Sequence, residues 1–285
     1  MVSREHLLHR KRTEFPALES TKKIVSVITH SERRRAGPIA TAGNLDTPSI
    51  DSAVSLLFED GRRPDAARIE RLGESSGEFA LIRTVSDPLE LLANGLTFDL
   101  SGALPGVRAP PPPTRYSFGM DGEPNGVLAA LTVRPGPHLA GGGAMPPVIR
   151  CLALLGAILA DLPGARGVVW HPARTLCSPD YIRRAVMRWI EGGVFPGFGL
   201  TALATLDDGS LQSEGLVLFA RKELRILGDV ASTPADMAKV GLRLLDWLVA
   251  NGGLEEEVPL TGPAGESLYM RPLVKEGVFE VGRSS

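Results

Sequence analysis

Cysteine is scarce in this chain: only Cys151 and Cys177 occur in 285 residues. Two cysteines provide neither a disulfide framework nor the ligand spacing of a zinc site, so we expect no bound metal. Such low cysteine usage is typical of the reducing cytoplasm. The N-terminus lacks the apolar core of a signal peptide. The longest strongly apolar run, Cys151–Ala160, is shorter than the roughly 20 residues that span a bilayer. We therefore predict a cytoplasmic protein with no membrane partner.

A large charge of one sign is also missing, because the formal net charge is −2. Residues 1–35 contain nine Lys or Arg and four Glu, a balance of +5, so the rest of the chain carries −7. An acidic body argues against a nucleic-acid-binding protein. Residues 1–48 show no sustained periodicity, and we predict a basic, poorly ordered leader there. The alternative is an arm that contacts nucleic acid or an acidic partner, with the apolar stretch Ile24–Ile28 forming a strand or a docking peptide.

Residues 49–285 are predicted to form a single composite α+β domain. Helical periodicity and capping residues indicate helices from Pro64, from Pro147 to Leu162, after the cap Ser178 and after the cap Thr233. In the first of these helices, Ala67, Ile69 and Leu72 are expected to face inward. Strands are expected at 53–58, 78–85, 96–100, 167–170, FGLTALATL, EGLVLFA and KELRIL, with RYSFGM pairing GVLAALTV and ESLYMRPL pairing VFEV. Many adjacent strands favour mixed or largely antiparallel sheets with strand–helix–strand units, of the split βαβ or ferredoxin-like kind.

The stretch EGLVLFARKELRI (Glu214–Ile226) places Gly215, Leu216 and Phe219 ahead of Glu223. Together with the strand ending at Trp170, the segment YIRRAVMRWI and the segment GFGLTAL, it resembles the bacterial domain-of-unknown-function family four-two-six-one over roughly residues 50–280. Ala220 stands where that family often has a glycine. The resemblance implies a fold and a cytosolic bacterial origin, and it implies no activity.

The segment WHPARTLCSPDY (Trp170–Tyr181) concentrates reactive residue types. Cys177 precedes a predicted helix start, where exposed N–H groups lower a thiol pKa. His171 follows a predicted strand and is a candidate base, and Asp180 is a candidate orienting residue. The competing interpretation is structural: Ser178, Pro179 and Asp180 cap a helix, while Cys177 fills an apolar gap.

No other pattern indicates a cofactor. The run Gly141–Gly143 is not followed by Lys-Ser/Thr, and Gly197-Phe198-Gly199 lacks the rest of a dinucleotide fingerprint. His6 and His9 have no evident third ligand for a metal. The hypothesis that follows is a non-enzymatic accessory or protein-interaction protein of bacteria. The alternative is a cysteine-dependent hydrolase or transferase that uses Cys177 and His171.

Overall fold

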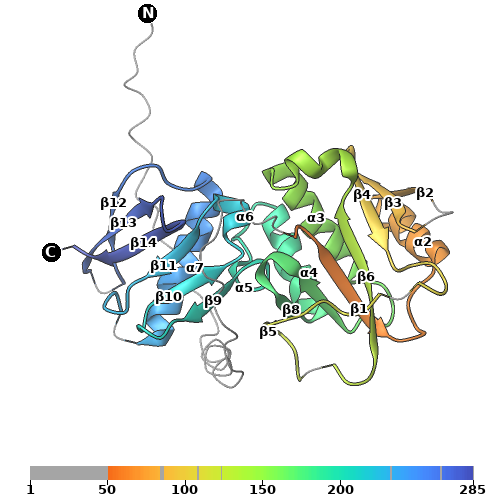
Figure 1. Cartoon of the computed structure of the whole chain (residues 1–285), viewed down its shortest axis with the longest axis horizontal. Helices are drawn as coiled ribbons and strands as arrows, with labels where there is room; N and C mark the ends of the chain where they lie inside the picture. The colour runs from red at the N-terminus through yellow and green to blue at the C-terminus, as the bar shows by residue number, and fades with distance from the viewer. Residues whose placement is uncertain are drawn as a thin grey trace, which may run out of the picture.

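The computed structural model of the chain describes residues 51–83, 87–107, 109–122, 124–231, 233–263 and 265–284. The predicted leader, residues 1–48, lies outside them. The described residues form two sheets that lie side by side (Figure 1). Helices α4 (Pro179–Ile190), α5 (Gly197–Leu200) and α6 (Val217–Ala220) lie at the junction between the sheets.

The first sheet has eight strands in the order β2-β3-β4-β6-β1-β7-β8-β5. The only parallel pair among its described strands is β5 with β8. The bounds are β1 (Val54–Glu59), β2 (Ala80–Arg83), β3 (Leu89–Ala93), β4 (Leu96–Ser101), β5 (Tyr116–Phe118), β6 (Leu128–Pro135), β7 (Gly167–Trp170) and β8 (Thr175–Cys177).

The second sheet has six strands in the order β12-β13-β14-β11-β10-β9, and β11 runs parallel to β14. Its strands are β9 (Ala202–Thr205), β10 (Leu211–Glu214), β11 (Glu223–Ile226), β12 (Val258–Thr261), β13 (Ser267–Leu273) and β14 (Val278–Arg283). The chain follows the same order in both halves: one strand, then a helix, then a three-stranded antiparallel meander. In the first sheet this order is β1-α2-β2-β3-β4, and in the second it is β11-α7-β12-β13-β14. The α+β class with mixed, mostly antiparallel sheets is thereby confirmed.

The three capped helices begin where side-chain acceptors satisfy their first amides. Asp65 caps α2 (Ala66–Ser76), Ser178 caps α4, and Thr233 caps α7 (Pro234–Asn251). The caps predicted at Ser178 and Thr233 are therefore confirmed. In α2, Ile69 is buried and Leu72 packs against the core as expected, whereas Ala67 is exposed, so only Ala67 was assigned wrongly.

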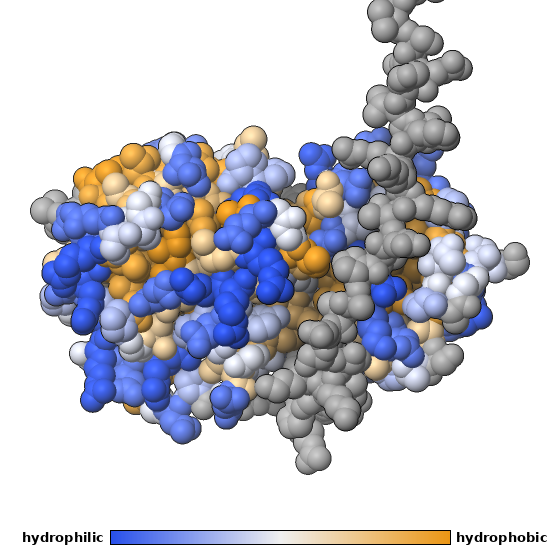
Figure 2. All heavy atoms as spheres, turned by 180° about the vertical axis from the view of Figure 1, so that it is seen from behind, coloured by the Kyte–Doolittle hydropathy of each residue, from blue (hydrophilic) through white to orange (hydrophobic). Residues whose placement is uncertain are grey.

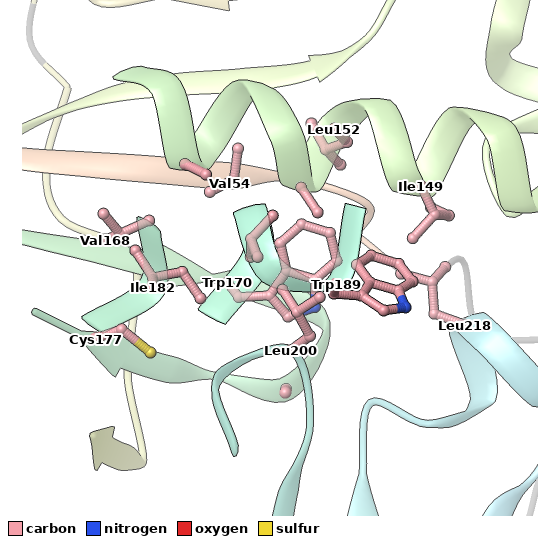
Figure 3. Packing of buried hydrophobic residues seen from close by; sticks show 14 of the residues in the cluster. Val54, Ile149, Leu152, Val168, Trp170, Cys177, Ile182, Trp189, Leu200 and Leu218 are labelled. Atoms are coloured by element: carbon pink, nitrogen blue, oxygen red, sulfur yellow. The ribbon is translucent and has the colours of Figure 1, made fainter. Parts of the chain in front are cut away.

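The buried face of the first sheet packs against α3 (Pro146–Leu159), which is apolar except for Arg150 and is buried from Val148 to Leu159 apart from that residue. Figure 3 shows Ile149 and Leu152 of α3 above Trp170 of β7 and Trp189 of α4, with Leu218 reaching the same cluster from α6. This hydrophobic cluster also includes Leu211, Leu224 and other residues of the second sheet. The two sheets therefore share one core. No helix among the described residues is long and apolar enough to cross a membrane.

Several strand predictions were wrong. EGLVLFA is not one strand, because β10 ends at Glu214 and the short helix α6 begins at Val217. Likewise, the first part of FGLTALATL is the turn α5, and β9 begins only at Ala202. RYSFGM does not pair with GVLAALTV, since β5 pairs with β8 and β6 lies between β4 and β1. The ESLYMRPL–VFEV pair is confirmed as β13 and β14.

Candidate functional site

The segment WHPARTLCSPDY forms a tight hairpin that separates its two reactive side chains. β7 ends at Trp170, a 3-10 turn covers His171–Ala173, and β8 returns antiparallel with Trp170 opposite Thr175 and Val168 opposite Cys177. Cys177 therefore lies about three residues along the strands from His171, or roughly 10 Å. The structure does not bring the proposed thiol and base together.

Cys177 is also in the wrong environment for a nucleophile. Its side chain is fully buried beside Gly199, and Figure 3 shows it at the end of the hydrophobic cluster away from Trp189. Burial raises the pKa of the Cys177 thiol to about 12, and a hydrogen bond with Thr175 lowers it only in part. Burial likewise raises the pKa of Cys151 to about 11. A helix N-terminus alone does not form a thiolate when the sulfur is desolvated to this extent.

His171 has two other partners. Its Nε2 lies 2.8 Å from Ser55 Oγ on β1, and its Nδ1 lies 2.9 Å from Asp51 Oδ2. Arg134 of β6 donates to both oxygens of the same carboxylate at 3.2 Å. Asp180 is exposed in the first turn of α4 and does not orient the imidazole. Asp51, not Asp180, is therefore the carboxylate that orients His171.

These spacings match those of a Ser-His-Asp triad, but access to the serine does not. Ser55 is fully buried in the middle of β1, between β6 and β7, and its hydroxyl also bonds Thr132 Oγ1 at 2.7 Å. A nucleophile needs a position about 3 Å away that a substrate atom can occupy. Burial lowers the pKa of His171, although the bond to Asp51 opposes this, so the neutral ring is favoured. We call the hydrogen-bonded chain Ser55–His171–Asp51 the histidine relay. It provides hydrogen-bond partners for a buried hydroxyl and joins three strands.

A cavity of about 320 Å³ lies where the two halves of the protein meet. We call it the α3–α7 groove, because α3 and α7 contribute to its walls together with α4, α6 and the loop after α4. Its lining residues are Pro146, Arg150, Trp189, Gly192, Gly193, Phe195, Leu218, Phe219, Asp246, Val249, Ala250 and Gly252. Most of them are apolar or aromatic, as in many ligand and peptide sites.

An aromatic cluster supports the floor of the groove. Phe219 contacts Phe195 and Trp189 edge to face, with ring centroids 4.9 and 6.2 Å apart, and stacks on Trp170 at 6.4 Å. These are the geometries that aromatic pairs prefer. The indole N–H of Trp170 is buried and has no acceptor among the described residues. Phe219 belongs to the EGLVLF motif, so this motif contributes directly to the groove.

Glu223 fixes the position of α6 and hence of Phe219. Its carboxylate accepts the amide N–H groups of Gly215 at 2.9 Å, Leu216 at 3.1 Å and Val217 at 3.2 Å. It also accepts the hydroxyl of Ser213. Burial raises the pKa of Glu223, while these hydrogen bonds lower it and offset part of the desolvation. The sequence pattern suggested a strand, but its glutamate holds the first turn of a helix.

Two charged groups give the α3–α7 groove polarity. The guanidinium of Arg150 lies 4.5 Å from the ring centroid of Trp189, and one of its N–H groups donates to the carbonyl of Ile190 at 3.3 Å. Asp246 accepts the amide N–H of Phe195 at 2.8 Å. Since an arginine has five N–H donors, Arg150 retains capacity to bind an acidic group.

Three exposed apolar residues are neighbours in sequence of residues that line the groove. Met145 precedes the lining residue Pro146, Val194 separates Gly193 from Phe195, and Trp247 follows Asp246. Their exposures are 57%, 55% and 38%.

Among the described residues, no group of three His, Cys, Asp or Glu side chains is arranged to hold a metal ion. Comparison with family models, with curated proteins and with solved structures finds no significant match to the chain. The resemblance to family four-two-six-one therefore stays a prediction, and the site is argued from its own geometry.

Proposed function

We propose that this protein is a non-enzymatic interaction protein that binds a peptide segment of a partner protein in the α3–α7 groove. The observation that carries the proposal is the cavity of about 320 Å³ lined by Trp189, Phe195 and Phe219, with Arg150 at its wall. A concave site lined mostly by apolar and aromatic side chains, with a few polar groups, is typical of ligand and peptide binding. A cytoplasmic location belongs to the same proposal and is supported by the two free, buried cysteines.

The groove favours a partner segment with a particular chemistry. Its aromatic floor offers a pocket for a large apolar anchor side chain, which is the usual centre of an interface hot spot. Arg150 lies at the wall of the pocket with unused N–H donors, so an acidic residue next to the anchor is complementary to it. The expected partner segment therefore combines an apolar anchor with a neighbouring Asp or Glu.

A peptide selection tests this proposal. A random peptide library is panned on the full chain, and the affinity of the selected peptides is measured by titration calorimetry. We expect the peptides to share a large apolar residue beside an acidic one. Ala250→Trp, which places an indole from the exposed surface of α7 into the groove, should weaken binding at least about 30-fold.

The matched control is Ala67→Trp, the same substitution on the exposed surface of α2, which does not line the groove. It should leave the affinity unchanged. Arg150→Gln should weaken peptides that carry the acidic residue by about 10-fold and leave their alanine analogues unaffected. If no peptide is retained, or if Ala250→Trp binds the selected peptides as well as the wild type does, the proposal is wrong.

Chemical catalysis has less support from the geometry. Cys177 and His171 are apart, Cys177 is fully buried, and Ser55 of the triad-like relay is shielded from substrate. The groove contains neither of these nucleophiles. Binding is therefore the function that we infer.

A further inference from the structure

A second cavity, of about 500 Å³, lies at the opposite end of the first sheet from β5. We call it the α2–β2 groove. Glu70 and Glu74 of α2 and Glu78 line one part of it, and Phe79, Leu81 and Leu92 line another. It shares no residue with the α3–α7 groove, so an argument from it is independent of the function proposed above.

The α2–β2 groove adjoins an open sheet edge. β2 is the terminal strand of the eight-stranded sheet, and one side of its backbone has no neighbouring strand among the described residues (Figure 1). Such an edge is a template for an added strand. Ile82 of β2 is 50% exposed, and Leu92, opposite Ala80 in the neighbouring β3, is 37% exposed. Figure 2 shows hydrophobic surface bordered by hydrophilic side chains on this half of the molecule.

The charged residues that line the groove are all acidic. Glu70, Glu74 and Glu78 are exposed, and no basic residue lines the cavity. Nor does any ion pair join these three carboxylates to a basic residue within the part of the chain that the structure describes. A ligand with basic groups beside an apolar, extended stretch would match both parts of this surface.

We propose that residues 22–35 of this same chain dock on the β2 edge, with the Ile24–Ile28 stretch added as a strand and the flanking basic residues next to the three glutamates. This segment reads KKIVSVITHSERRR and lies outside the described residues. Its centre is rich in β-branched residues, which favour strands. Lys22 and Lys23 precede that centre, and Arg33, Arg34 and Arg35 follow it.

The length of the connecting chain permits this contact. β1 starts close to Asp51, where the described part of the chain begins, and four strand spacings separate β1 from β2. The added strand lies one spacing beyond β2, and five spacings amount to about 24 Å. The residues between Arg35 and Asp51 can extend to roughly 50 Å. A segment tethered within reach also has a high effective concentration, so modest contacts suffice.

Amide hydrogen exchange on the full chain, followed by mass spectrometry, tests the proposal. We expect peptides covering residues 24–28 and β2 to exchange at least about tenfold more slowly than unpaired chain. Replacing Arg33, Arg34 and Arg35 by Glu should make the protected amides exchange about tenfold faster. Val27→Pro, which removes one amide donor and disrupts an added strand, should abolish the protection at residues 24–28 and reduce it at the β2 amides that do not bond β3.

The matched control replaces Arg10, Lys11 and Arg12 by Glu, an equal charge change outside the docking segment, and should leave the protection intact. Combining the Arg33–Arg35 changes with Glu70→Lys and Glu74→Lys should restore it. Fast exchange of residues 24–28 in the wild type, or protection that is unaffected by the Arg33–Arg35 changes, would overturn the proposal. Protection that rises with protein concentration would overturn it as well, because the strand would then come from a second copy.

Discussion

Removing the Glu223 carboxylate is expected to destabilise the protein and to loosen the α3–α7 groove. In Glu223→Ala the amides of Gly215, Leu216 and Val217 and the hydroxyl of Ser213 all lose their acceptor. Each buried donor left unsatisfied costs about 1–3 kcal/mol, and water that enters the site offsets part of the total. We therefore expect a loss of about 3–5 kcal/mol, a large share of the roughly 5–15 kcal/mol that stabilises a typical domain.

Glu223→Gln provides the graded comparison. The glutamine side chain retains one acceptor oxygen. Its NH₂ group takes the place of the second carboxylate oxygen and faces two donors, the Ser213 hydroxyl and the Leu216 amide, which then lose their acceptor. We expect a loss of about 1–2 kcal/mol. Urea unfolding at pH 7 measures both variants, with Glu256→Ala, an exposed position, as the control.

Tryptophan fluorescence reports on the groove in the same samples, because Phe219 packs on Trp170 and Trp189. We expect the native emission of Glu223→Ala to shift to the red as Phe219 loses its fixed position. A loss below about 1 kcal/mol for Glu223→Ala, with unchanged native fluorescence, would refute the role that we assign to this carboxylate.

Three further predictions concern the thiols, the histidine relay and a glycine. Burial raises the pKa of Cys151 to about 11 and of Cys177 to about 12. Iodoacetamide at pH 8 should therefore modify neither thiol in the native protein and both thiols in urea. Stoichiometric labelling of Cys177 in the native protein would contradict this. Since burial lowers the pKa of His171 below its ordinary value of about 6.5, the unfolded state takes up a proton that the native state does not as the pH falls through that value. The unfolding free energy should accordingly fall between pH 7.5 and 5.5, and by less in His171→Gln; equal losses in the two proteins would argue against the assigned shift. Gly215→Ala should lower the free energy of unfolding, measured in urea, by about 2–4 kcal/mol. The reason is that the backbone has φ of 91° and that a Cβ would lie 2.8 Å from Ala173 Cβ. An unchanged free energy would show that the turn relaxes freely.

Local sequence signals identified the four long helices correctly. Ser178–Pro179 and Thr233–Pro234 mark the starts of α4 and α7, because a side-chain acceptor followed by proline satisfies the first turn with groups close in sequence. The apolar spacing from Val148 to Leu159 identifies α3 in the same way.

The strand predictions failed where distant partners decide the structure. β5 adds to β8 in parallel, although the nearer strand β6 was available in sequence. α6 forms because a carboxylate six residues beyond its start accepts its N-terminal amides. The apolar pattern within EGLVLFA gives no indication of that hydrogen bond, so it could not predict the helix.

The histidine relay shows the same limit at a single residue. His171 was singled out correctly as a residue of interest, but its partners Ser55 and Asp51 are more than a hundred residues away and become neighbours only when β7 pairs with β1. The nearer candidates, Cys177 and Asp180, lie on other elements that face elsewhere.

The sequence by itself determined the α+β class, the capped helices and the sharp division between a basic leader and an acidic body, because composition, periodicity and caps act over a few residues. Tertiary structure alone decided the order of the strands, the partners of His171 and the α3–α7 groove. Each of these depends on contacts between elements distant in the chain, and their free energy is gained only when both sheets share one core.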